Sequence, residues 1–245
     1  MTTSWLRGLV DILFPPSCEL CGEGLGADRR TCVCERCLGA MPAPEPPWCD
    51  RCGVPVGTTA QPRLCPSCLH HPPRFASARA AALYRPSGPG LNLPDPLAVA
   101  IQRLKYARRR ALADALGHLL ATRYPFAADA LLVPVPLHLT RLRERGFNQA
   151  VLLARRLGRT RGLPVASRAL IRLRATHAQP GLGAAARRRN LADAFALRPG
   201  FVVARRTLVL VDDVLTTGAT ADACATVLLA AGATRVDVYT VGRAP

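Results

Sequence analysis

The sequence predicts an α/β protein, in which a domain built on a parallel β-sheet is preceded by a small cysteine-rich module. Leu208–Val211 is a run of four apolar residues, typical of a strand covered on both faces, and the alanine-rich segment 219–231 predicts a helix packed on it. A second apolar run, at 130–135, is followed by helical spacing at 148–161. Eight cysteines in the first seventy residues form C-x2-C pairs, which indicates a separate module.

The N-terminal residues 5–14 place apolar side chains on one face of a short predicted helix. This segment is too short to span a bilayer, and it lacks the uninterrupted apolar run and cleavage site of an export signal. We therefore expect a cytoplasmic protein without a membrane span.

The remaining elements follow from apolar periodicity and from loop residues. Helical spacing at 97–107 and 111–123 predicts a helical connector, and 74–84 is its first segment. We expect three further strands, at 169–173, 194–197 and 236–241, to complete the parallel sheet. The predicted domains are 1–72 for the cysteine-rich module, 73–128 for the connector or hood and 129–245 for the sheet domain.

The cysteine pairs repeat with the same C-x2-C-x12-C-x2-C spacing after a displacement of 31 positions. The first set is Cys18, Cys21, Cys34 and Cys37, and the second is Cys49, Cys52, Cys65 and Cys68. Four thiolates at this spacing match tetrahedral structural zinc, whereas a disulfide framework is typical of exported chains. The sequence predicts two zinc ribbons, with consecutive and interleaved ligation both open, and leaves Cys32 and Cys224 as plain thiols.

The chain is strongly basic, with 33 Lys and Arg against 16 Asp and Glu. This excess predicts attraction to polyanions, although the 5% aromatic content leaves few side chains on which bases can stack. Lys105 is the only lysine, and we expect it on an exposed helix surface, with contact to a phosphate as the alternative. Arginine clusters occur at 108–110, 141–145, 155–161 and 187–189, of which the third is expected to be a solvated helix face.

The most informative motif follows the buried run 208–211 directly. Asp212 and Asp213 come first, and then the turn Thr216, Thr217, Gly218, Ala219 and Thr220 opens the next helix. Hydroxyls and free N–H groups at a helix N-terminus suit a phosphate, while the carboxylates suit ribose hydroxyls or a magnesium ion. The loop lacks the glycine and lysine order of NTPase and dinucleotide sites, so we expect a sugar phosphate ligand.

This loop resembles the phosphoribosyl-diphosphate (PRPP) loop of type I phosphoribosyltransferases. Further motifs are Pro-Val-Pro-Leu-His at 134–138, Arg-Gly-Phe-Asn-Gln at 145–149, Gln179, 188–190 and Ala-Phe at 194–195. With them the chain resembles the ComF family, which is phosphoribosyltransferase-like, is associated with bacterial DNA uptake and often carries a double zinc ribbon. The chain departs from the family pattern in a Gly/Pro-rich insert at 88–96.

The resemblance implies a PRPP site with Asp212 and Asp213 as its catalytic carboxylates and Mg²⁺ bound with PRPP. The other implied PRPP contacts are Val214, Thr216, Thr217, Gly218, Ala219, Thr220, Pro136, Leu137, Arg141, Arg145 and Arg188. The segment 172–190 is implied to close over the site, and His138 is expected to be packed or solvated.

Three functions remain open from the sequence. The first is an active transferase on an unknown acceptor, for which Thr216 stands where purine-salvage relatives carry an acidic residue. The second is a nucleic-acid-binding factor that senses PRPP without turnover, and the third is a zinc-ribbon scaffold with a vestigial pocket. The resemblance implies single-stranded DNA, a DNA-uptake helicase and other competence proteins as partners.

Overall fold

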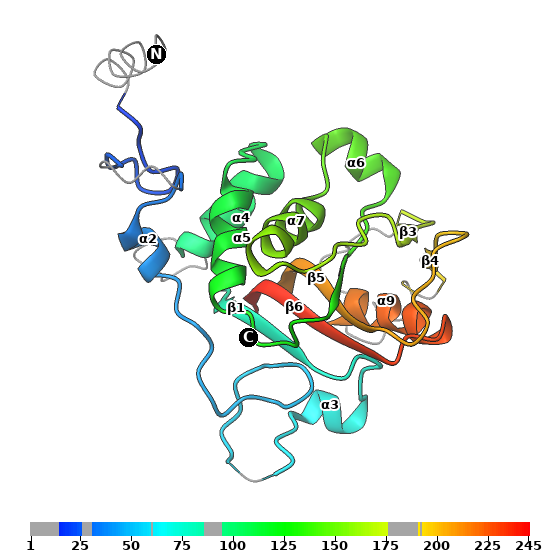
Figure 1. The fold of residues 1–245 in the computed structure, drawn as a ribbon. Coiled ribbons are helices and arrows are strands. Elements are labelled where there is room, and N and C mark those ends of the chain that lie inside the picture. Colours follow the sequence, from blue (N-terminus) through cyan, green and yellow to red (C-terminus); the bar gives the residue numbers. More distant parts are fainter. Residues whose placement is uncertain (1–14, 26–30, 60, 86–94, 176–190, 192) are drawn as a thin grey trace.

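A computed structural model describes residues 15–25, 31–59, 61–85, 95–175, 191 and 193–245 (Figure 1). The predicted helix at 5–14 lies outside these residues, as do Gln179 and Arg188. Among the helices described, none is both long enough and apolar enough to cross a bilayer.

The core of the protein is a four-stranded parallel sheet, as the sequence predicts. Its strands are β1 (Ala78–Leu83), β2 (Leu131–Pro134), β5 (Thr207–Leu215) and β6 (Arg235–Arg243), in the order β1-β6-β5-β2. The predicted strand at Leu208–Val211 is thus an interior strand, flanked on both sides. Pro134 pairs with Val211, so β2 ends beside the residue that precedes Asp212, and β5 continues beyond it to Leu215.

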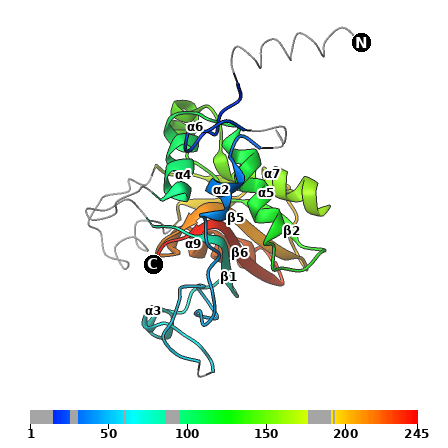
Figure 2. The same ribbon diagram turned by 90° about the vertical axis from the view of Figure 1, so that its left-hand side faces the viewer.

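Helices cover both faces of the sheet (Figures 1 and 2). One face carries α4 (Pro96–Tyr106), α5 (Leu112–Thr122) and α7 (Gln149–Arg161), and the other carries α9 (Ala219–Ala230). Because side chains alternate along a strand, Val209 and Val211 pack toward the first layer, and Leu208 and Leu210 pack toward α9. The short helix α6 (Leu139–Arg145) follows β2 at its carboxyl end.

Two expectations need correction. Residues 78–83, which were assigned to the helical connector, form β1 at one edge of the central sheet, where they pair with β6. The predicted strands at 169–173 and 194–197 do not join the parallel sheet: β3 (Leu170–Arg172) and β4 (Phe195–Leu197) form a separate antiparallel pair. Antiparallel neighbours need no crossover between them, so two strands that follow each other in the sequence can pair in this way.

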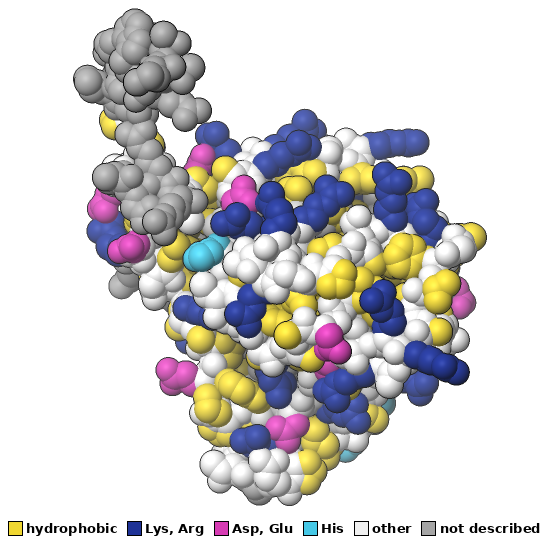
Figure 3. All heavy atoms as spheres, in the orientation of Figure 1, with side chains coloured by type: hydrophobic (Ala, Val, Ile, Leu, Met, Phe, Trp, Pro, Cys, Tyr) yellow, Lys and Arg dark blue, Asp and Glu magenta, His cyan; other side chains and the backbone are white. Residues whose placement is uncertain are grey.

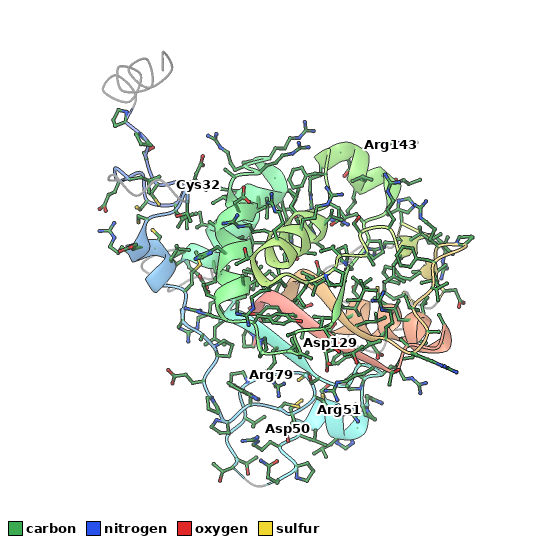
Figure 4. The ribbon with its side chains drawn as sticks, viewed as in Figure 1. Cys32, Asp50, Arg51, Arg79, Asp129 and Arg143 are labelled. Atoms are coloured by element: carbon green, nitrogen blue, oxygen red, sulfur yellow. The ribbon has the colours of Figure 1, made fainter. Side chains whose placement is uncertain are left out.

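The two cysteine modules pack at different places on the sheet domain. The first ribbon (residues 15–40), with α2 (Glu35–Gly39), shares a core with α4 and α5. The second ribbon (residues 47–71), with α3 (Pro66–His70), packs against β1, where Arg79 donates to the Asp50 carbonyl at 3.2 Å. Figure 4 shows Asp50, Arg51 and Arg79 together at this boundary.

Candidate functional site

The eight predicted cysteine ligands form two separate groups of four. In each group the four Sγ atoms lie within 4.8 Å of one another: Cys18, Cys21, Cys34 and Cys37 in the first, and Cys49, Cys52, Cys65 and Cys68 in the second. A tetrahedron with Zn–S bonds of about 2.3 Å has S···S edges of about 3.8 Å. The Cys21–Cys34 and Cys52–Cys65 separations are 3.7 and 3.6 Å, so ligation within each repeat fits zinc and interleaved ligation does not.

Backbone N–H groups favour the thiolate form of one cysteine in each group. Burial opposes ionisation of Cys18, but hydrogen bonds from the backbone N–H groups of Cys34, Cys21 and Leu20 lower its pKa to about 6. In the second ribbon the equivalent residue, Cys49, has its pKa lowered to about 7 by the same kind of contacts. Two structural zinc sites match the donor set because four cysteine sulfurs converge in each group, and the metal binds them as thiolates.

Asp212 and Asp213 lie near the carboxyl end of β5 and face opposite sides of the sheet. Asp213 has the same parity as Val211 and points toward α4, whereas Asp212 points toward the side of α9. Asp213 Oδ1 accepts from the Val214 N–H at 2.8 Å, and Asp212 Oδ1 accepts from the Asp213 N–H at 2.9 Å. The two carboxylates are thus fixed by the backbone that directly follows them.

Lys105 is the ion-pair partner of Asp213 and is mostly buried, so the expectation of an exposed helix surface is wrong. Its Nζ lies 2.6 Å from Asp213 Oδ2, and only 22% of the lysine side chain and 6% of the aspartate side chain are exposed. Burial lowers the pKa of Lys105, but the Asp213 carboxylate outweighs that effect and the net shift is upward. The pair is therefore charged, and Lys105 forms an ion pair with Asp213, the second carboxylate of the motif.

Asp212 has a different electrostatic setting. Burial and the nearby charge of Asp213 raise the pKa of Asp212 to about 7, although Lys105 opposes the shift. The carboxyl therefore exchanges its proton near neutral pH. A cation or hydroxyl donor that binds Asp212 would compete with that proton.

The turn after β5 (residues 216–220), called the hydroxyl loop below, presents donors to solvent. Among hydrogen bonds between described residues, none is donated by the backbone N–H groups of Thr216, Thr217 and Gly218. Gly218 has φ of 78°, a left-handed conformation that favours glycine, and α9 begins at the next residue. Free N–H groups, two exposed hydroxyls and a helix N-terminus together form an anion-binding cradle.

The segment after β2 lies beside these groups. The Val135 N–H donates to the Val211 carbonyl at 3.0 Å, and the Asn148 side-chain amide donates to the Val135 carbonyl at 3.0 Å. Pro136 and Leu137 are thereby held at the same edge of the sheet as Asp212. His138 Nδ1 accepts from the Thr140 N–H at 3.3 Å and caps α6, so its contacts are structural.

The predicted arginines are placed differently from one another. Arg145 is 8% exposed, donates to Gln149 and lies over the Tyr106 ring, 5.7 Å from its centroid. The positive charge of Arg145 also lowers the pKa of Lys105. Arg141 is exposed on α6. Arg188 lies outside the described residues.

Arg172, on β3, lies near the carboxylates, and the sequence analysis gave it no role as a charge. Burial lowers the pKa of its guanidinium, while Cys224 and Asp212 act in the opposite direction. The charge of Asp212 therefore acts on Arg172 as well as on its neighbouring aspartate. The sequence around Arg172 does not show whether its guanidinium lies near other charges of the site or in solvent.

A cavity of about 720 Å³ separates the hydroxyl loop from the second ribbon. Thr216, Thr217 and Gly218 form one wall, while Cys68 and His70 are part of the opposite wall. The hydroxyl loop therefore lies next to the second zinc site.

Many arginines outside the site already have protein partners. Arg108 donates to the Glu144 carbonyl, and Arg110 donates to the Gly146 carbonyl at 3.0 Å, so both support the C-terminal end of α6. Arg159 lies 3.6 Å from Asp114 on the neighbouring helix. In Figure 3, basic side chains nevertheless predominate along the edge of the molecule over α6.

Comparisons with solved structures give low similarity. The glutamine PRPP amidotransferase from B. subtilis, complexed with ADP and GMP, shares 23% identity and a TM-score of 0.36 over 60% of this chain and 27% of that one. A hypoxanthine phosphoribosyltransferase from Staphylococcus aureus shares 13% identity and a TM-score of 0.31 over 54% of this chain and 60% of that one.

Sequence comparisons identify a family domain and two named relatives. The double zinc ribbon domain family matches residues 9–69. DNA utilization protein YhgH from Escherichia coli O157:H7 is 40% identical over 155 residues, which cover 60% of this chain and 67% of that protein. Competence protein F from Haemophilus influenzae is 34% identical over 162 residues, or 61% and 69% of the two chains. With its double zinc ribbon and its similarity to these two proteins, the chain belongs to the ComF family.

Proposed function

We propose that the chain binds PRPP at the carboxyl ends of β2 and β5. The observation that carries this proposal is the set of N–H groups of Thr216, Thr217 and Gly218, which have no acceptor among the described residues and open onto the start of α9. These groups would take the 5′-phosphate of PRPP, because unpaired donors at a helix N-terminus favour an anion.

The two carboxylates would serve different purposes. Lys105 already neutralises Asp213. Asp213 would position the ribose, and it accepts a hydrogen bond from the Val214 N–H. Asp212, which points to the other side of the sheet from the Lys105–Asp213 ion pair, would meet the ribose hydroxyls or Mg²⁺ brought with PRPP. Pro136 and Leu137 would border the diphosphate, with Arg141 and Arg145 as its cationic neighbours.

A transferase reaction at this site would displace diphosphate from the anomeric carbon of the ribose. The carbon–oxygen bond to diphosphate breaks as a bond to the acceptor forms, and positive charge develops on the sugar ring. Charge stabilisation and positioning supply the catalysis, so no protein nucleophile is needed. Thr216 offers a hydroxyl rather than a carboxylate beside the ribose, which favours an acceptor that needs no strong base.

Calorimetry of PRPP with and without Mg²⁺ tests this proposal. We expect magnesium-dependent binding that the double substitution Asp212→Asn and Asp213→Asn weakens at least ~100-fold, because two charge-assisted contacts are lost. Asp129→Asn is a control for the loss of a single carboxylate away from the site, because Asp129 is exposed before β2, at the opposite end of that strand (Figure 4). Equal PRPP affinity in the parent and the double variant would contradict the proposal.

A second function, in DNA uptake or the processing of incoming single-stranded DNA, is favoured by the relatives and by charge. One relative is named a DNA utilization protein and the other a competence protein, and this chain carries a net charge of +17. Arginines along α6 would contact phosphates, and a DNA-uptake helicase and other competence proteins in the cytoplasm would be its partners. In the non-catalytic alternative, the pocket senses PRPP while the basic surface binds the strand.

Fluorescence anisotropy with a labelled single strand tests direct DNA binding. We expect the affinity to fall linearly with salt on logarithmic axes, with a smaller slope in the variant Arg141→Gln and Arg143→Gln, because neutralised phosphates release counterions. Arg205→Gln and Arg206→Gln, before β5, provide a control with the same change in charge. Binding that ignored salt would contradict the electrostatic account.

A further inference from the structure

Arg243 joins the second zinc site to the hydroxyl loop. It is the last residue of β6 and is 6% exposed. Its Nε donates to the Cys52 carbonyl at 2.9 Å, and its Nη2 lies 3.6 Å from the Cys52 sulfur. Its Nη1 donates to the carbonyls of Leu215 and Thr216, at 3.1 and 3.0 Å. One guanidinium therefore contacts a zinc ligand and two successive peptide units at the start of the loop.

These contacts determine where the loop's N–H groups point. A trans peptide unit is planar, with its C=O and N–H directed oppositely. Because Arg243 holds the carbonyls of Leu215 and Thr216, the N–H groups of Thr216 and Thr217 face away from the guanidinium. Those are two of the three N–H groups that have no acceptor among the described residues. Arg243 thus orients the donors that would receive the phosphate.

The chain leaving the second ribbon supports the same loop. Phe75 is buried under Gly218, where a Cβ added to the glycine would lie 3.6 Å from the ring. The Arg74 N–H donates to Asp222 in the first turn of α9. The ribbon itself is fitted closely to the sheet, since a Cβ at Gly53 would lie 2.5 Å from the Ala78 carbonyl oxygen.

The first ribbon has no equivalent contact among the described residues. It packs on the helical layer, where Arg103 donates to the Glu19 carbonyl and Arg109 lies 3.5 Å from Glu19. The ribbons lie apart in both views, with α2 beside α4 and α3 near the opposite end of the sheet domain (Figures 1 and 2). The first zinc site can therefore serve as an internal control when metal is removed from the second site and the effect on the hydroxyl loop is measured.

We propose that Arg243 is a positioning residue through which the second zinc centre, and not the first, orients the phosphate-binding loop. A zinc ion bound by four thiolates leaves a net negative centre, for which the Arg243 guanidinium is an outer-shell partner. Loss of the metal frees Cys52, and the arginine then loses one of its two anchors. The inference rests on the proposed PRPP site for its ligand, although its structural part can be tested without PRPP.

Matched zinc-ligand variants of the full chain provide the first test. Cys37→Ser and Cys68→Ser occupy equivalent repeat positions, and among the described residues the Arg243 guanidinium bonds to neither of these cysteines. Amide exchange at Ala244, whose N–H donates to the Leu215 carbonyl at 3.0 Å, reports the anchoring of the loop. We expect Cys68→Ser to accelerate this exchange and weaken PRPP binding, each by about tenfold or more. In Cys37→Ser, exchange at Ala244 should stay within about twofold of the parent.

Arg243→Lys tests the arginine itself, with two zinc ions still bound. A lysine keeps the charge but cannot span Cys52 and both carbonyls, so exchange at Ala244 should rise and PRPP affinity should fall about tenfold. Arg235→Lys, at the other end of β6, should leave both unchanged. Equal exchange at Ala244 in Cys37→Ser and Cys68→Ser would overturn the inference whatever the result with PRPP. Failure of the parent to bind PRPP would overturn the proposed function and leave the zinc-to-loop coupling to be decided by exchange alone.

Discussion

Replacing Lys105 with methionine should destabilise the protein far more than removing an ordinary surface cation. The substitution keeps most of the apolar stem and removes the ammonium group 2.6 Å from Asp213. Asp213, with 6% of its side chain exposed, would then carry an uncompensated charge next to the α4 layer. Removing one partner of a fully buried pair costs about 3–5 kcal/mol.

The expected magnitude is smaller than that upper range. Because 22% of the Lys105 side chain is exposed, solvent screens part of the interaction, and we expect about 2–3 kcal/mol. For a chain of this size that is a decrease in Tm of about 4–12 °C. Thermal unfolding at pH 7.5 with zinc present measures it.

Two controls make the result decisive. Arg159→Met removes one side of an exposed pair with Asp114 and should cost about 0.5 kcal/mol or less. The double variant Lys105→Met and Asp213→Asn should recover part of the loss, since neither member is then a buried, unpaired charge. A decrease for Lys105→Met no larger than that for Arg159→Met would refute the assignment of a buried ion pair.

Three further predictions follow from the same site. Burial raises the pKa of Asp212 to about 7, so ionisation of this carboxyl opposes folding as pH rises from about 4 toward 7. Asp212→Asn should therefore raise Tm more at pH 8 than at pH 5. Equal increases in Tm at the two pH values would contradict this. Metal analysis of the purified chain should find two zinc ions, with one lost in Cys68→Ser, whereas a parent with fewer than two would exclude the paired sites. Gly218→Ala should lower stability by about 1 kcal/mol, measured by urea unfolding, because alanine is strained at a φ of 78°; an unchanged midpoint would show that the turn relaxes.

Local patterns in the sequence were sufficient to predict the elements that surround the site. The apolar run at 208–211, the paired aspartates and the alanine-rich helix are contiguous, so periodicity and residue type define β5, the hydroxyl loop and α9. The zinc ligands were likewise predictable, because their spacing is itself the signal.

Long-range packing decided the elements that the sequence analysis missed. Residues 78–83 include four alanines, which favour helix by themselves, and they form β1 only because β6 offers a free edge. The direction of β3 and β4 is not encoded in their short apolar runs.

The same limit applied to two charged residues of the site. Lys105 occupies an ordinary helix position, and its partner lies 108 residues later. The role of Arg243 depends on its contacts with Cys52 and Leu215, which are far apart in the sequence. Neither contact leaves a local pattern.

Amide exchange with and without PRPP measures directly whether the hydroxyl loop is the phosphate site. The N–H groups of Thr216, Thr217 and Gly218 have no acceptor among the described residues, so they should exchange rapidly in the free protein. With PRPP and Mg²⁺ added, exchange of these three amides should slow together, because the phosphate supplies the missing acceptors. Rates that remain unchanged at saturating PRPP would contradict the claim that the hydroxyl loop is its phosphate site.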